Sequence, residues 1–186
     1  MFQTGKESEA RTQSNTNFSE VLITQLENMN IAFDELRRKT IFHTRCGIKD
    51  NTFSMIIDFG SGVNVVSSYV VEKLKLTCIQ HTTHKRQWIN SLGEYKVTKQ
   101  CMISFSIGKY SDNVLCDVIL MQDCHIMLGS PWQLSRNAIH DRRKNRVSLE
   151  LNKKRYILAP LTPSQVCEDQ KRVKELMKKI ESEKMR

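Results

Sequence analysis

The 186-residue chain carries 29 lysine and arginine residues against 20 aspartate and glutamate residues, which gives a formal net charge of +9 at pH 7. Hydrophobic residues make up 39% and charged residues 26%, as in globular proteins, and no apolar run approaches the roughly 20 residues that span a bilayer. The N-terminus lacks the short apolar core of a secretory signal, so we expect a cytoplasmic protein, with the nucleus as the alternative, and no membrane partner.

The two ends of the chain predict elements outside a central domain. Residues 1–17 are polar and predict a disordered tail. Large apolar residues then recur at steps of three and four, and Asn17 with Glu20 fits a capping box, so residues 18–39 predict an amphipathic helix. Residues 164–186 combine many basic side chains with a helical apolar spacing, which predicts a basic C-terminal helix or linker.

A single carboxylate ends the first strongly apolar run. Residues 53–57 predict a strand that leads into Asp58, and the small residues at 60–62 allow a tight turn after it. A carboxylate placed there is costly unless a partner or a function requires it. It either caps its own turn through its side chain or belongs to a catalytic site. Asp117 is the rival carboxylate, but no glycine-rich turn follows it, so we predict a solvent-facing strand residue there.

The rest of the central region alternates with a period near two. The spacing and the turn residues predict a short helix within 66–76, a hairpin over 87–100 with its turn near Gly93, paired strands at 103–107 and 114–121, a buried strand ending at Gly129 before Pro131, and a last hairpin from 147 to 158. We therefore predict one domain over residues 40–163.

Other chemical motifs are weak. The six cysteines are scattered without metal-ligand spacing, so we expect reduced thiols and neither a metal nor a cofactor. Cys124 beside His125 suggests a catalytic dyad, but neighbouring residues of a strand point to opposite faces. The basic residues cluster without interleaved aromatic residues, which favours solvated surface and leaves nucleic acid as a weakly supported partner.

A series of short sequence motifs resembles, in order and spacing, the retropepsin-like aspartic protease segment of plant gypsy-type retrotransposon gag-pol polyproteins, whose genes lie between long terminal repeats. The motifs are IFHTRC at 41–46, IIDFGS at 56–61, VEKL at 71–74, QWIN at 87–90, VTKQ at 97–100, FSIGKY at 105–110, VLCDV at 114–118, MLGSPWQ at 127–133 and LTP at 161–163.

The resemblance implies a mostly β fold, a closed antiparallel barrel with one or two short helices, flanked by N- and C-terminal helices. It implies a homodimeric endopeptidase for polypeptide substrates, in which one Asp58 from each chain helps to activate water. In this family the corresponding positions form the active-site loop, the flap and the segment that braces the loop. They are, in that order, Asp58, Phe59, Gly60 and Ser61; Trp88, Ile89, Asn90, Ser91, Leu92 and Gly93; and Ile126, Met127, Leu128 and Gly129.

Two positions depart from the family's pattern. Phe59 stands where familiar members have Thr or Ser, whose hydroxyl bonds across the dimer axis, and a small-to-large change in a packed site commonly costs about 1–3 kcal/mol. Ser130 stands where many relatives have an Arg able to anchor the loop. These departures favour the alternative, a catalytically inactive relic that serves as a dimerisation or binding module.

Overall fold

The computed structural model describes residue 25 and residues 41–87 and 94–184. The chain divides into two compact units, Met1–Lys39 and Thr40–Arg186. The predicted tail and N-terminal helix lie outside the described residues, apart from position 25, and so do the flap positions 88–93.

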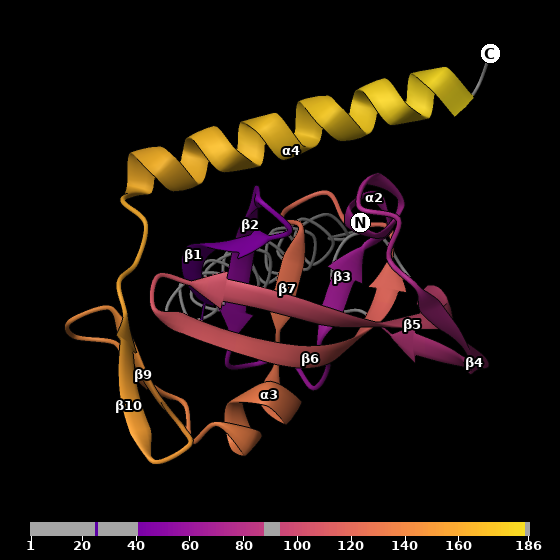
Figure 1. Cartoon of the computed structure of the whole chain (residues 1–186). Helices are drawn as coiled ribbons and strands as arrows, with labels where there is room; N and C mark the ends of the chain where they lie inside the picture. The colour runs from indigo at the N-terminus through magenta and orange to yellow at the C-terminus, as the bar shows by residue number, and fades with distance from the viewer. Residues whose placement is uncertain (1–24, 26–40, 88–93, 185–186) are drawn as a thin grey trace, which may run out of the picture. The chain divides into compact units, whose positions relative to one another are not determined.

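Strands dominate the described part of the second unit (Figure 1). In chain order its elements are β1 (Ile41–Ile48), β2 (Asn51–Asp58), β3 (Val65–Ser67), α2 (Ser68–Lys73), β4 (Cys78–Gln87), β5 (Glu94–Ile107), β6 (Tyr110–Ile119), β7 (Ile126–Leu128), α3 (Ser130–Ser135), β8 (Ile139–Asp141), β9 (Arg146–Leu151), β10 (Lys154–Leu158) and α4 (Pro163–Lys184). No helix among these residues combines the length and the apolarity needed to cross a membrane.

The larger sheet closes on itself. Its strand order is β1-β2-β7-β3-β6-β5-β4, and the pairing of Gly47 in β1 with Ser106 in β5 joins its two sides into a barrel of six strands, with β4 as an extra strand on β5. The mostly β, closed fold that we expected is confirmed. Two of its pairings are parallel, however, because β7 inserts beside β2 and β6 runs beside β3.

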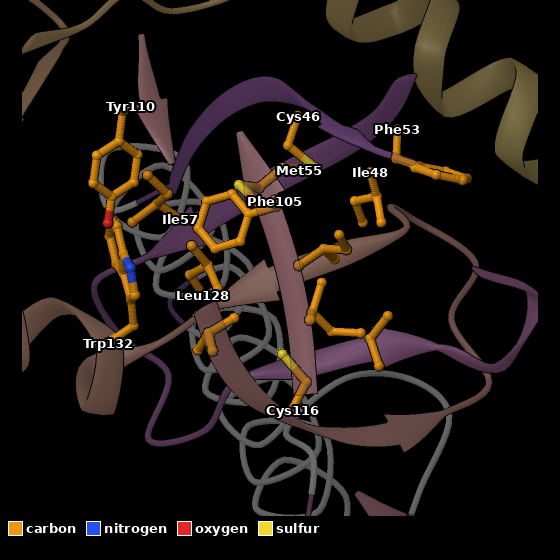
Figure 2. Packing of buried hydrophobic residues seen from close by; sticks show 14 of the residues in the cluster. Cys46, Ile48, Phe53, Met55, Ile57, Phe105, Tyr110, Cys116, Leu128 and Trp132 are labelled. Carbon is orange, nitrogen blue, oxygen red and sulfur yellow. The ribbon is translucent and has the colours of Figure 1, made fainter. Parts of the chain in front are cut away.

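Side-chain alternation explains how the strands fill the barrel. The burial pattern of β1 alternates strictly and turns Phe42, Thr44, Cys46 and Ile48 inward. In β2 the run Met55–Ile57 is buried on both faces, since its side chains supply two separate clusters. Figure 2 shows the larger cluster, where residues from β1, β2, β5, β6 and β7 meet with Trp132 of α3.

Tight turns fix the register of the hairpins. Lys49 and Asp50 both have positive φ (45° and 62°) between β1 and β2, and Asn152 and Lys153 repeat this (53° and 60°) between β9 and β10. Two consecutive positive φ values define the type I′ turn, whose twist matches that of paired strands. The predicted hairpin from 147 to 158 is therefore confirmed, and so are the paired strands β5 and β6.

The last elements include two that the sequence patterns did not predict. Strand β8 adds to β9 and β10 in a separate three-stranded sheet, and α3 begins at Ser130, after the N-cap Gly129, with Pro131 in its first turn. The predicted short helix within 66–76 is confirmed as α2, and Val65–Ser67 pair as β3 before it begins.

The predicted C-terminal helix is confirmed as α4, which begins at Pro163. Thr162 and Gln165 form a capping box at its start, with the Thr162 amide donating to Gln165 Oε1 at 2.9 Å. One turn later Asp169 accepts two hydrogen bonds from the Arg45 guanidinium, at 2.8 and 2.7 Å. This bidentate pair ties α4 to β1.

Candidate active site

Asp58 is the last residue of β2 and caps the turn that follows it. The Gly60 amide donates to Asp58 Oδ1 at 2.8 Å, and the Ser61 amide donates to the Asp58 carbonyl at 3.2 Å. A Cβ at position 60 would lie only 3.3 Å from that carboxylate oxygen, so glycine suits this close approach. The carboxylate is half-buried. Its turn-capping role is thus present, and a catalytic role needs further features around it.

A second segment, from β7 into α3, holds the loop at several backbone points. The Ser130 amide and hydroxyl both donate to the Ser61 carbonyl, at 2.7 and 2.9 Å. Gln133 Nε2 donates to the Asp58 carbonyl at 2.8 Å, and Asn64 Oδ1 accepts from the Gly129 amide at 2.9 Å. The loop that carries the carboxylate is therefore fixed from outside its own hairpin.

Gly129 permits this contact. A Cβ on Gly129 would lie 2.2 Å from the Val63 carbonyl oxygen and 2.7 Å from the Ser61 carbonyl oxygen, both atoms of the loop backbone. Its own φ of −104° suits any residue, so the need for glycine is one of space alone. The two backbones lie too close together for any side chain at this position.

Strand β7 explains why the two segments meet. It pairs parallel to β2, with Ile56 beside Met127, and antiparallel to β3, with Met127 opposite Val65. Side chains of a strand alternate, so Ile56 and Asp58 face the same side of β2. Ile56, Val65 and Met127 belong to the smaller buried cluster, and Asp58 therefore stands at the edge of that cluster.

The side chain of Phe59 packs against other residues of the same chain. Its ring stacks on His140 of β8 with centroids 5.2 Å apart and an interplanar angle of 26°. It is half-buried and packs against the larger core cluster. The bulk that departs from the family's pattern is thus accommodated within the chain.

Helix α3, which supplies Gln133, is itself anchored by a buried carboxylate. Asp112 accepts from Arg136 Nε and Nη2, both at 2.8 Å, from Trp132 Nε1 at 3.0 Å and from the Tyr110 hydroxyl. Burial acts to raise the pKa of Asp112, but the hydrogen bonds, led by that from Arg136, outweigh it and hold the pKa at about 2. The carboxylate stays ionised and pins α3 to the β5–β6 hairpin.

The competing sites of the sequence analysis have other surroundings. Asp117 is 6% exposed and accepts from Gln100 Nε2 at 2.7 Å, so the prediction of a solvent-facing residue is wrong. Cys124 is buried, and burial raises the pKa of its thiol, which disfavours the reactive thiolate. Burial also lowers the pKa of His125 to about 4, and its Nδ1 contacts the Ser54 hydroxyl at 2.8 Å.

The predicted site residues are thus brought together in part. The loop 58–61 and the bracing segment 126–129 lie in direct contact through Gly129 and Ser61, whereas the flap positions fall outside the described residues. The pairing of β4 with β5 continues as far as Gln87 and Glu94, so a hairpin leads toward those positions. Sequence reasoning assigned no role to Gln133, Asn64 or His140, because each acts only through the tertiary approach of distant segments.

An open pocket lies apart from this loop. It has a volume of about 710 Å³ and is lined by residues of α2, β4, β5 and β6, among them Val71, Leu76 and Ile119. No residue of the Asp58 loop lines it. The candidate site is therefore identified by the bracing of a carboxylate and not by a cavity.

No protein-family model matches the sequence, and no curated protein does. Solved structures with a similar chain path include the retroviral protease-like domain of Ddi1 from Leishmania major, at 14% identity and a TM-score of 0.47, covering 64% of this chain and 95% of that one. A retropepsin-like aspartic protease from Rickettsia conorii follows at 18% and 0.43, covering 63% and 84%. The EIAV protease bound to an inhibitor follows at 15% and 0.36, covering 50% and 85%. At these values the likeness carries no inference about activity.

Proposed function

We propose that this chain is a retropepsin-like aspartic endopeptidase that acts as a homodimer with one Asp58 from each subunit. The observation that carries the proposal is the bracing of the Asp58 loop. The segment after β7 contacts it through the Ser130 and Gln133 bonds and the close approach of Gly129. A residue that only caps its own turn has no need of such external support.

The chemistry follows from bringing two such loops together. Two neighbouring carboxylates cannot both ionise readily, so the pair holds one proton between them. The ionised carboxylate takes a proton from a water that attacks the scissile carbonyl, and the protonated one delivers its proton to the leaving amine. The reaction needs no metal.

The proposed dimer rests on the count of catalytic motifs. The sequence holds one Asp-x-Gly, at Asp58–Gly60, so a single chain supplies half of the required pair. A second copy of the chain is the simplest source of the other carboxylate, and a twofold axis would place equivalent loops opposite each other.

The proposed substrate is a polypeptide, specifically the retrotransposon polyprotein that the short sequence motifs indicate. The nucleus or cytoplasm would be the place of action.

Cleavage of an unfolded peptide library tests this function directly. We expect cleavage at acidic to neutral pH, inhibition by pepstatin, a dimer mass in solution, and loss of cleavage in Asp58→Asn. Asp50→Asn is the matched control, because Asp50 lies in the exposed turn at the other end of β2, where its positive φ suits asparagine. Equal activity of Asp58→Asn and the unaltered chain would refute the proposal.

The alternative is an inactive relic that uses the same fold as a dimerisation or binding module. It is favoured by the lack of a hydroxyl at Phe59, which removes the bond that members with Thr or Ser make across the dimer axis. An unaltered chain that dimerises but cleaves none of the library would support this alternative.

A further inference from the structure

We propose that His140 is a positioning residue for the Asp58 loop, because its ring fixes Phe59 from within the same chain. The inference rests on the proposed function and extends it. It assigns a supporting role to a residue of β8, an element that belongs to the separate three-stranded sheet.

The ring of His140 contacts two phenyl rings. It stacks on Phe59 at 5.2 Å between centroids, and it meets Phe42 of β1 edge-on at 5.7 Å with an interplanar angle of 78°. Stacked and edge-to-face pairs at these separations are both favourable. Phe59 directly follows Asp58 in the chain. Because the Phe59 ring is held against His140, the backbone of Asp58 has less freedom to move.

The two ring nitrogens of His140 make few polar contacts among the described residues. Its Nε2 lies 3.2 Å from Asn145 Oδ1, within the same hairpin. Its Nδ1 is buried without a hydrogen-bond partner among the residues that the structure describes. A buried nitrogen without a partner costs stability, so the contacts of the ring with Phe59 and Phe42 must offset that cost.

The sheet that carries His140 is held in place by hydrogen bonds of its own turn and by helix α3. In β8 and β9, His140 pairs with Val147, and the turn between them is capped by Asp141 Oδ1, which accepts from two backbone amides of the turn. The Glu150 amide donates to the Arg136 carbonyl at 2.8 Å and so joins this sheet to the end of α3. The same helix braces the loop through Gln133, so both supports share one anchor.

Three variants test the proposal. His140→Ala removes the ring, His140→Phe keeps the ring and removes both nitrogens, and Ile139→Ala is the matched control, since that neighbouring side chain is 64% exposed. We expect His140→Ala to lower kcat about three- to tenfold with little change in KM, as the loss of an aromatic pair suggests. His140→Phe and Ile139→Ala should stay close to the unaltered chain.

Amide hydrogen exchange at Gly60 and Ser61 provides a readout that does not need activity. Both amides bond within the Asp58 turn, so a loosened loop exchanges them faster. We expect faster exchange in His140→Ala alone among the three variants. If His140→Ala fails to fold, Phe59→Leu removes the stack from the other side and should give the same increase.

The outcomes separate this inference from the proposed function. Unchanged exchange in the folded stack-deleting variants overturns the role of His140, whatever the activity. A loss of kcat in His140→Phe as large as in His140→Ala also overturns it, because the imidazole itself would then be required. An unaltered chain without peptidase activity refutes the proposed function, while the exchange result still decides whether His140 holds the loop.

Discussion

The contact between Gly129 and the Asp58 loop leaves no room for a side chain at position 129. Gly129→Ala is therefore the sharpest test of the bracing of that loop. The added Cβ would lie 2.2 Å from the Val63 carbonyl oxygen, 2.7 Å from the Ser61 carbonyl oxygen and 2.9 Å from the Val63 carbonyl carbon. All three are backbone atoms, which cannot rotate away as the end of a long side chain can. The loop or the β7–α3 segment must shift by roughly 1 Å to restore ordinary contact.

The cost of this shift can be estimated from two contributions. Overpacking of a tightly packed site costs about 1–3 kcal/mol. Separating the two segments also weakens the bond from the Ser130 amide to the Ser61 carbonyl, now 2.7 Å, which is worth about 1 kcal/mol. We expect Gly129→Ala to lose about 3 kcal/mol of unfolding free energy, which at this size corresponds to a fall in Tm of about 6–12 °C.

Urea unfolding of the variant and of the unaltered chain measures this difference in unfolding free energy, with equal m-values as the condition for the comparison. Gly62→Ala is the matched control, because a Cβ there meets no atom within 4 Å in the same loop. We expect the control to stay within about 0.5 kcal/mol of the unaltered chain. If Gly129→Ala is as stable as Gly62→Ala, the two backbones do not approach as closely as the structure shows. The proposed bracing of the loop would then be refuted as well.

Two further perturbations test the supports of the site. The pKa of Asp112 falls from an ordinary 3.8 to about 2 on folding, so its ionised form contributes about 2 kcal/mol that is fully present above pH 4 and lost as the pH falls toward 2. Asp112→Asn should therefore cost about 2 kcal/mol in urea unfolding at pH 7 and almost nothing near pH 2, and a cost that does not depend on pH would contradict the role of its charge. Phe59→Thr should lower peptidase activity and speed amide exchange at Gly60, because it deletes the stack on His140, whereas a relic inactivated by the phenyl ring should gain activity from the same change.

Local patterns predicted the parts of the fold in which one strand face is buried and the other exposed. In β5, Ile103 and Phe105 alternate with exposed Ser104, and the hairpin with β6 forms as expected. The apolar pattern did not predict strand β1, because one of its inward positions is the polar residue Thr44. One of its half-buried outward positions is Arg45, which forms an ion pair with Asp169 of α4. A mixed face of this kind carries no clear period, and only the partner strand and helix reveal it.

The candidate site was predicted to the extent that it is local. Asp58 and the small residues after it form one turn, and the glycine that ends β7 stands out as a close approach of backbone. What the close approach meets could not be predicted, since the partners Ser61 and Val63 lie more than 60 residues earlier in the chain. The parallel insertion of β7 between β2 and β3 is the non-local step that unites them.

The two departures from the resembling family take a different meaning once these contacts are considered together. Ser130 anchors the loop through its amide and hydroxyl, while Arg136, the C-cap residue of the same helix, forms an ion pair with Asp112. Phe59 stacks on His140 inside its own chain instead of offering a hydroxyl to a partner. Both supports of the loop are thus intramolecular, so the loop keeps its shape without a second subunit. Association of two chains would then join loops that are already ordered, and the entropy of ordering them would not oppose the dimer.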